Sequence, residues 1–232
     1  MTKKLNDYLN ENVPDVIKFI AEEIKLSPDI INSIPALGVM LNSLLFIGSR
    51  ITLQRFRNFL KILNFELNND LVKFFSKISN EDVKEFLHDS ARKAVEEKSD
   101  ILRKAVAIHT AIVIKNNQVN LTDIKIFRSF KDLSDLEIRA FLFYLELDYA
   151  QSTEETTFRY SSNYDQAMSE KLEVPMDQMD DFIKELFDHL KALKFFNGGS
   201  IVLTENGNGF LVGRPNNHFH EMIEILKKAS VM

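Results

Sequence analysis

The sequence contains no cysteine among its 232 residues. This excludes disulfide bonds, thiolate metal sites and cysteine nucleophiles, and it fits a reducing compartment. Glycine and proline are scarce as well, with 7 and 5 residues. Because these two residue types mark turns, their scarcity favours long helices over a sheet of many strands.

A secretory signal and a membrane-spanning run are also missing. The first residues are followed by acidic ones where a signal peptide would place its apolar stretch. The most apolar stretch, residues 34–47, is shorter than the roughly 20 residues that a spanning helix needs. We therefore expect a cytoplasmic protein in which residues 34–47 form a buried hairpin or core helix.

The composition is that of a globular protein, with 45% hydrophobic and 27% charged residues. The net charge is −5, and residues 151–232 carry all of this acidic excess, since the two signs balance over residues 1–150. The abundance of Lys, Asn, Ile and Phe suggests an AT-rich genome, as in many bacteria and their phages. The length suits one large domain or two small ones.

Apolar residues at helical spacing predict four helices in the first half of the chain. Their expected ranges are 13–26, 51–67, 79–96 and 100–115. Ser79 is the expected N-cap of the third helix. The fourth carries two apolar stripes, so we place it at the centre of a bundle, with His109 as a core histidine satisfied by a hydrogen bond.

The next helix has a well-marked beginning. Ser134 and Glu137 have the spacing of a capping box, and Leu133 with Ile138 would form its hydrophobic staple. We expect this helix to span 133–148. The side chains expected on its buried face are Leu136, Ala140, Phe143 and Leu147. Residues 150–164 are polar and are interpreted as a loop or insertion.

The last third of the chain is patterned like a winged helix. In this interpretation 133–148 is the first helix, 176–196 is the recognition helix ended by Gly198-Gly199, and 200–212 is the wing. A final helix is expected over 216–229. We therefore predict a mainly α fold with two domains. The first is a helical bundle over 1–131, and the second is a winged-helix-like domain over 132–232 with a small two-stranded β-hairpin.

No group of residues in the sequence has the pattern of a catalytic, cofactor or metal site. His220 and Glu224 lie one helical turn apart, but two weak ligands do not make a metal site. Adjacent carboxylates such as Asp180 and Asp181 point about 100° apart on a helix and do not converge on one atom. The glycines of 207–213 fit a tight turn better than a phosphate loop. We expect a non-enzymatic protein with no cofactor and no metal.

The expected recognition helix is acidic where a DNA reader would be basic. Affinity for duplex DNA comes largely from Lys and Arg that neutralise phosphates. DNA is therefore a disfavoured partner, and we expect a protein partner or a homodimer, with a winged-helix DNA-binding regulator as the alternative. The candidate partner-binding residues are Asp177, Asp181, Lys184, Glu185 and Asp188.

A second candidate surface combines the apolar stretch 34–47 with the cations that follow it. Such a segment inserts into an anionic membrane surface in some proteins. The favoured interpretation is burial in the N-terminal bundle, and a membrane-acting defence effector is the further alternative. The candidate membrane or partner residues are Leu37, Met40, Leu44, Leu45, Arg50, Arg57 and Lys61.

The order of these segments resembles that of poorly characterised bacterial and prophage proteins of the abortive-infection alpha type. The resemblance covers about residues 30–150. It rests on Ile34-Pro35-Ala36-Leu37-Gly38, on Arg55-Phe56-Arg57-Asn58-Phe59-Leu60 and on the amphipathic helices that follow. It implies a role in phage–host conflict. It transfers no site residue, and it does not include the winged-helix-like end.

Overall fold

The structure is a computed structural model, and its chain is mainly helical. It describes residues 50–130, 133–148, 157–159, 165–192, 196–203, 209–215 and 218–232. The helix expected over 13–26 lies outside these ranges, and so does the apolar stretch 34–47. None of the helices within them is both long and apolar enough to cross a membrane.

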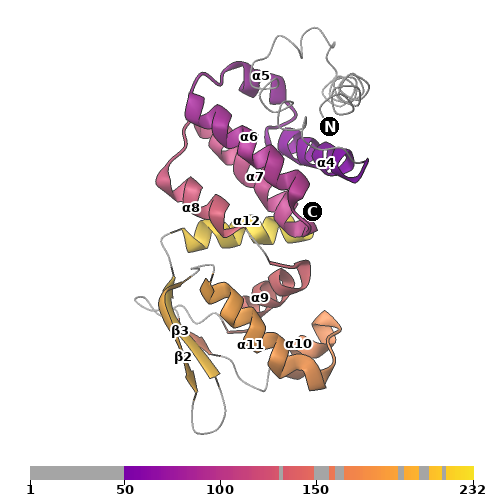
Figure 1. The fold of residues 1–232 in the computed structure, drawn as a ribbon, viewed down its shortest axis with the longest axis vertical. Coiled ribbons are helices and arrows are strands. Elements are labelled where there is room, and N and C mark those ends of the chain that lie inside the picture. The colour runs from indigo at the N-terminus through magenta and orange to yellow at the C-terminus, as the bar shows by residue number, and fades with distance from the viewer. Residues whose placement is uncertain are drawn as a thin grey trace, which may run out of the picture. The chain divides into compact units, whose positions relative to one another are not determined.

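The chain divides into two compact units, Met1–Phe127 and Arg128–Met232. The expected domain boundary after residue 131 stays a prediction. The helices of the first unit are α4 (Arg50–Glu66), α5 (Leu71–Ser76), α6 (Glu81–Glu96), α7 (Asp100–Asn116) and α8 (Leu121–Ser129), the last of which contains the division in its final turn (Figure 1).

Helix α7 is the centre of the first unit, as its two apolar stripes predict. It packs against α4 and α6, which lie beside it (Figure 1). Among the residues of the two apolar stripes of α7, only Ile112 is partly exposed, and the others are buried. The apolar side chains at helical spacing within residues 51–67 and 79–96 are buried: Phe56, Phe59, Leu60, Leu63, Leu67, Val83, Phe86 and Leu87.

Side chains cap the beginnings of α6 and α7 in the first unit. Asn80, not the expected Ser79, caps α6, because its side-chain oxygen accepts a hydrogen bond from the Asp82 amide at 2.9 Å. Ser99 caps α7 in the same way, through the Leu102 amide at 3.0 Å. These bonds satisfy amides that have no partner within the helix.

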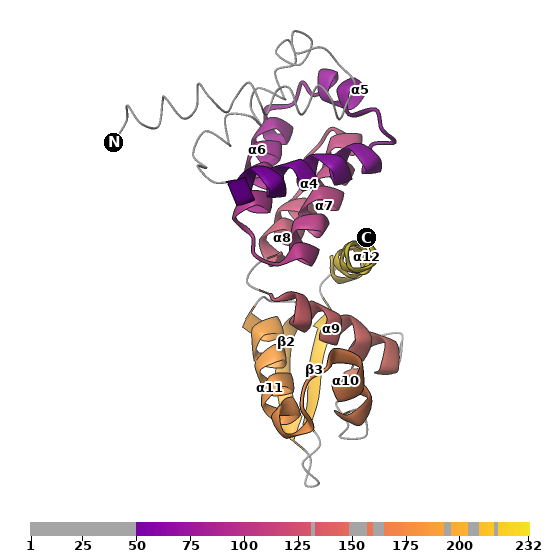
Figure 2. The ribbon, with the colours of Figure 1, turned by 90° about the vertical axis from the view of Figure 1, so that its right-hand side faces the viewer.

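The second unit contains four helices within the described residues. They are α9 (Asp135–Asp148), α10 (Asp165–Leu172), α11 (Met176–Ala192) and α12 (Phe219–Val231). Figure 2 shows α9, α10 and α11 grouped together, and α10 packs against both of the others.

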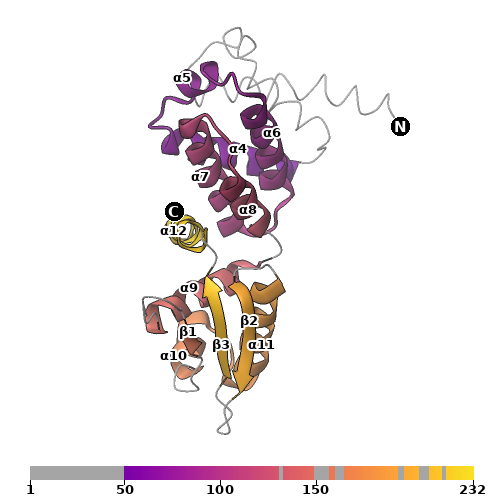
Figure 3. The ribbon, with the colours of Figure 1, turned by 90° about the vertical axis from the view of Figure 1, so that its left-hand side faces the viewer.

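Three strands form one sheet in the order β1-β3-β2. They are β1 (Thr157–Arg159), β2 (Phe196–Leu203) and β3 (Gly209–Pro215), and both pairings are antiparallel (Figure 3). Two expectations are corrected. Residues 157–159 form a strand within the expected loop, and Gly198 and Gly199 lie in β2 instead of ending the helix, beside an irregularity of register between Asn197 and Ser200.

Helix α9 begins with the predicted capping box. The Ser134 amide donates to Glu137 Oε2 at 2.7 Å, and the Glu137 amide donates to Ser134 Oγ at 3.1 Å. The expected buried face is wrong in part, because Leu136 is 38% exposed and Phe143 is half-buried. The buried side follows Ile138, Ala140, Phe141, Leu142, Tyr144 and Leu145 instead.

Candidate functional site

Helix α11 is amphipathic, and its apolar side is buried. The buried residues recur every three or four positions, so they lie along one side of the helix. They are Met179, Ile183, Leu186 and Leu190. Helix α10 leads into α11 through a tight turn, where Glu173 has a φ of 57° and Ser169 Oγ donates to the Val174 carbonyl at 2.6 Å. The turn fixes where α11 begins.

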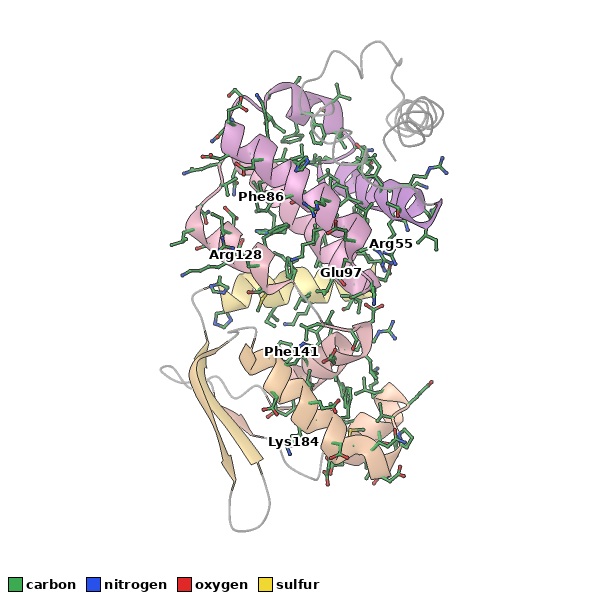
Figure 4. The ribbon with its side chains drawn as sticks, viewed as in Figure 1. Arg55, Phe86, Glu97, Arg128, Phe141 and Lys184 are labelled. Atoms are coloured by element: carbon green, nitrogen blue, oxygen red, sulfur yellow. The ribbon has the colours of Figure 1, made fainter. Side chains whose placement is uncertain are left out.

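The solvent-facing side of α11 carries the five candidate partner-binding residues of the sequence analysis. We call it the acidic ridge, and it consists of Asp177, Asp181, Lys184, Glu185 and Asp188. Positions 177, 181, 184 and 188 follow one another at steps of four, three and four residues, which keeps them on one side of a helix. All five side chains are exposed. Figure 4 labels Lys184 among the side chains of α11.

The charges of the acidic ridge are not neutralised by other described residues. None of the five side chains makes a hydrogen bond or an ion pair there. Two neighbouring carboxylates, Asp177 and Asp181, are four residues apart, and like charges at this spacing repel each other. A run of carboxylates on one side of a helix gives that side a negative potential, to which cationic groups are attracted and phosphates are not.

The negative charge continues from α11 onto α10. Burial raises the pKa of Asp165, and the nearby Asp180 carboxylate raises it further. Asp165 Oδ1 is buried and accepts no hydrogen bond from the part of the chain that the structure describes. Within the described ranges, no three His, Asp or Glu side chains are grouped so that they could hold a metal ion.

A hydrogen bond between side chains holds α11 against the beginning of α9. His189 Nδ1 lies 2.7 Å from Glu137 Oε1. Burial pushes the pKa of Glu137 up, but its hydrogen bonds with Ser134 and His189 outweigh burial and hold that pKa below its usual value. Glu137 thus remains a carboxylate that serves the capping box of α9 and orients α11 at once.

The second candidate surface is described only in part. Leu37, Met40, Leu44 and Leu45 lie outside the described residues. Arg50 is the first residue of α4, and its side chain is likewise outside the description. Arg57 is half-buried and Lys61 is exposed, four residues further along the same helix.

Lys61 lies at the edge of a cleft between α4 and the first turn of α7. The cleft has a volume of 160 Å³. Its other lining residues are Asn58, Phe59 and Ile62 of α4 and Asp100, Arg103 and Lys104 of α7. The sequence gives no sign of this cleft, because its two walls are about 40 residues apart in the chain and meet only through packing.

The histidines have structural surroundings. His109 is fully buried, and its Nε2 lies 3.3 Å from Asp123 Oδ1, as expected for a core histidine with a hydrogen-bond partner. His88 Nδ1 lies 3.3 Å from Asp89 Oδ1 at the surface. His220 is exposed on α12.

Arg55 and Lys93 are polar residues whose role the sequence does not reveal. Arg55 Nη1 donates to the Val95 carbonyl at 3.0 Å, and Lys93 Nζ donates to the Phe127 carbonyl at 2.6 Å. Both bonds satisfy carbonyls at helix ends, which stabilises the bundle.

Comparison with protein-family models, with curated proteins and with solved structures finds no match for this chain.

Proposed function

We propose that this chain is a non-enzymatic, cytoplasmic protein that binds another protein through the acidic ridge of α11. One observation carries the proposal: four exposed carboxylates and a single lysine line one side of α11 without a partner among the described residues. An unneutralised ridge of one sign is suited to recognise a partner of the opposite sign. The partner surface is therefore basic, with Lys or Arg side chains spaced to meet successive turns of a helix.

The winged-helix interpretation of the C-terminal unit belongs to the same proposal. The order of α9, α10, α11 and the antiparallel strands β2 and β3 is the order of helices and wing in that motif. In this proposal α11 is the recognition helix, and it contacts protein instead of a DNA groove. A homodimer and a role in phage–host conflict are compatible with this use of the helix and remain predictions.

The alternative is a winged-helix regulator that reads DNA. It requires a basic surface, because neutralised phosphates supply most of the affinity for duplex DNA. The acidic ridge opposes it, since α11 would bring four carboxylates to the phosphate backbone. A short DNA duplex at low salt distinguishes the two. We expect no binding by the full chain, and salt-sensitive binding would favour the regulator.

The experiment on the main proposal compares three forms of the full chain in pull-downs from the native cell. The ridge variant combines Asp177→Asn, Asp181→Asn, Glu185→Gln and Asp188→Asn. The control variant combines Asp82→Asn, Glu85→Gln, Glu146→Gln and Glu221→Gln, all exposed and outside the ridge. Each variant loses four negative charges, so the two variants differ only in where on the chain those charges are removed.

We expect the wild type and the control variant to retain the same protein, with release as salt is raised. The ridge variant should retain about tenfold less of it, since rim and surface charges set both the attraction and its salt dependence. Equal retention by the ridge variant would contradict the proposal.

A further inference from the structure

The cleft between α4 and α7 continues into an exposed aromatic side chain of α4. The apolar lining of the cleft is formed by Phe59 and Ile62. Phe65 lies one turn beyond Ile62 on the helix surface and is 61% exposed, although it is large and apolar. Two exposed polar residues of the same helix, Asn58 and Lys61, border the cleft. The apolar area is therefore short, and it consists of the hollow together with Ile62 and Phe65.

The α7 wall of the cleft is charged, but its charges are paired within that wall. Asp100 Oδ1 lies 2.8 Å from Arg103 Nη2, and Asp100 Oδ2 lies 2.7 Å from Lys104 Nζ. Arg103 Nη1 also donates to the carbonyls of Glu97 at 3.0 Å and Lys98 at 2.8 Å. Because these groups already have partners, an occupant of the cleft gains mainly from apolar contact with the α4 wall. An uncharged, apolar occupant therefore fits the cleft.

An apolar stretch without charge directly precedes α4 in the chain. Residues 34–47 are the most apolar of the sequence, and they include no Asp, Glu, Lys or Arg. Gly48 and Ser49 then join this stretch to Arg50, where α4 begins. Apolar side chains are stabilised when they leave water, and this holds for the stretch and for Phe65 alike. Contact between the two would remove both from water.

The apolar stretch is long enough to reach the cleft. Ile62 lies about 18 Å along the axis of α4 from Arg50, since each residue of a helix adds about 1.5 Å. The stretch has 14 residues, which span about 21 Å as a helix and about 46 Å when fully extended. Gly48 lets the chain reverse its direction before α4, because glycine adopts turn conformations without steric cost. The stretch therefore reaches the cleft in either conformation.

We propose that residues 34–47 fold back along α4 and cover the cleft, Ile62 and Phe65, with one of their apolar side chains inside the cleft. The cleft has a volume of 160 Å³, and an apolar cavity of about 150 Å³ holds a molecule of benzene. One leucine or phenylalanine side chain therefore fits the cleft. The candidate membrane or partner residues of this stretch then pack within the first unit. They are Leu37, Met40, Leu44 and Leu45.

The covalent connection favours this occupant over a second copy of the chain or a separate partner. A segment joined to its binding site by a short link is present there at a roughly millimolar effective concentration. A separate chain has to compete with the stretch at its own, lower concentration. The paired charges of the α7 wall also offer little attraction to an anionic membrane surface. The inference concerns the first unit alone, so it does not depend on the proposed function of the acidic ridge.

The experiment uses the full chain, which has no cysteine, so introduced thiols report on proximity alone. Asn58→Cys is combined in turn with Leu37→Cys, Leu41→Cys and Leu45→Cys. Mild oxidation at low protein concentration should give a disulfide within one chain for at least one of these pairs, because the bond requires two Cα atoms within about 7 Å. The matched control replaces Asn58→Cys by Lys115→Cys, an exposed position in the last turn of α7, and should give none.

A second measurement follows the reaction of Asn58→Cys with a water-soluble maleimide. Asn58 lines the cleft, so the stretch shields it from the reagent. Leu44→Asp with Leu45→Asp makes burial of the stretch unfavourable, and the reaction should become faster by about tenfold or more. The same two aspartates should leave the reaction of Lys115→Cys within about twofold. Circular dichroism of each variant must match the wild type.

The proposal is overturned if none of the cysteine pairs forms a disulfide within one chain, or if disulfides form only between chains, which would assign the cleft to a second copy. It is overturned equally if the two aspartates leave the labelling rate of Asn58→Cys unchanged. Binding of the wild type to phosphatidylserine vesicles that is lost with Leu44→Asp and Leu45→Asp would overturn it as well. The disulfide measurement contains no charged substitution, so it decides the question if the aspartate variant does not fold.

Discussion

The charges on α6 and α7 and the charges on α11 are arranged in different ways. On α6 and α7, cations lie next to carboxylates of the same helix: Lys84 with Glu81 at 2.7 Å, Arg92 with Glu96 at 2.9 Å, and Lys104 with Asp100 at 2.7 Å. On α11, the acidic ridge has no such pairs among the described residues. The two surfaces also differ in burial, since the Lys84 and Lys104 side chains are only 20% and 23% exposed, whereas all five side chains of the acidic ridge are exposed.

Charges that are paired within a helix contribute to the stability of the fold, whereas charges without such a pair are suited to contact another molecule. An exposed pair contributes about 0.2–1 kcal/mol to folding at most. Carboxylates four residues apart without a cation lower helix stability slightly. The acidic ridge is therefore not explained by stability, and the proposed binding to a basic partner would give it a role. The following substitutions test this contrast, from the largest expected effect to the smallest.

Asp123→Ala should destabilise the first unit strongly. Asp123 lies against the buried His109, and its Oδ2 accepts the Asn120 amide at 2.8 Å at the beginning of α8. Removing the carboxylate leaves buried polar groups unsatisfied, at a cost of about 2–3 kcal/mol in the free energy of unfolding. Urea denaturation of the full chain measures this cost. Asp181→Ala on the ridge serves as the control, with an expected change within about 0.5 kcal/mol.

The effect of Asp123 should also depend on pH. Burial raises the pKa of Asp123, but the hydrogen bonds with His109 and Asn120 dominate and lower it. A lowered pKa means that the carboxylate stabilises the fold above its unfolded pKa, and that this stabilisation is lost as the pH falls through the folded value. The free energies of unfolding of the wild type and Asp123→Ala should therefore converge as the pH is lowered from neutral to about 3, and a constant difference would argue against an ionised Asp123 carboxylate in the fold.

Ser134→Ala should destabilise α9 by about 1 kcal/mol, since it removes the side-chain half of a capping box. Ser134→Asp, which retains an N-cap oxygen, should recover most of the loss. Hydrogen exchange of the α9 amides reports the change locally. If the alanine variant exchanges as slowly as the wild type, the capping box does not hold α9 in solution.

Asp165→Asn should stabilise the second unit at neutral pH by less than about 1 kcal/mol, because solvent screens a partly exposed group. The raised pKa of Asp165 means that its charged form is disfavoured in the fold, and asparagine removes that charge. The gain should disappear as the pH falls below the unfolded pKa, where aspartate is neutral as well. Denaturation at neutral and acidic pH compares the two forms, and a loss of stability at neutral pH would contradict the assignment.

The ridge variant described above should have the smallest effect on stability. We expect it to unfold with a free energy equal to the wild type or a few tenths of a kcal/mol higher, because it relieves repulsion between like charges. Asp100→Asn makes the opposite comparison, since it removes a carboxylate that pairs with two cations and should lower stability slightly. A clear loss of stability in the ridge variant would show that the ridge supports the fold.

Local patterns in the sequence predict much of this fold, and contacts between distant segments are not predicted. The capping box at Ser134 and the apolar stripes of α7 depend on residues within two turns of each other, so they can be recognised in the sequence. Asn120 and Asp123 form a similar box at α8, and their spacing in the sequence is that of such a box, although the sequence analysis does not include it. Leu136 was placed on the wrong side of α9, because several apolar residues there allow more than one buried face.

The sites divide in the same way. The acidic ridge could be predicted because its five residues lie on one helix, and helical spacing alone places them together. The cleft could not be predicted, since Lys61 and Lys104 meet only when α4 packs on α7. The pairing of Glu137 with His189 joins residues 52 positions apart and is likewise a product of packing.

The most direct test of the central claim is cross-linking mass spectrometry of the full chain with its captured partner. Lys184 is the single amine of the acidic ridge, and Lys77 and Lys115 are exposed amines of the first unit. If the ridge is the binding surface, an amine-reactive cross-linker should join Lys184 to the partner. On Lys77 and Lys115 the second arm of the reagent should be hydrolysed by water without reaching the partner. Partner cross-links confined to Lys77 and Lys115, with Lys184 modified by reagent alone, would contradict the account.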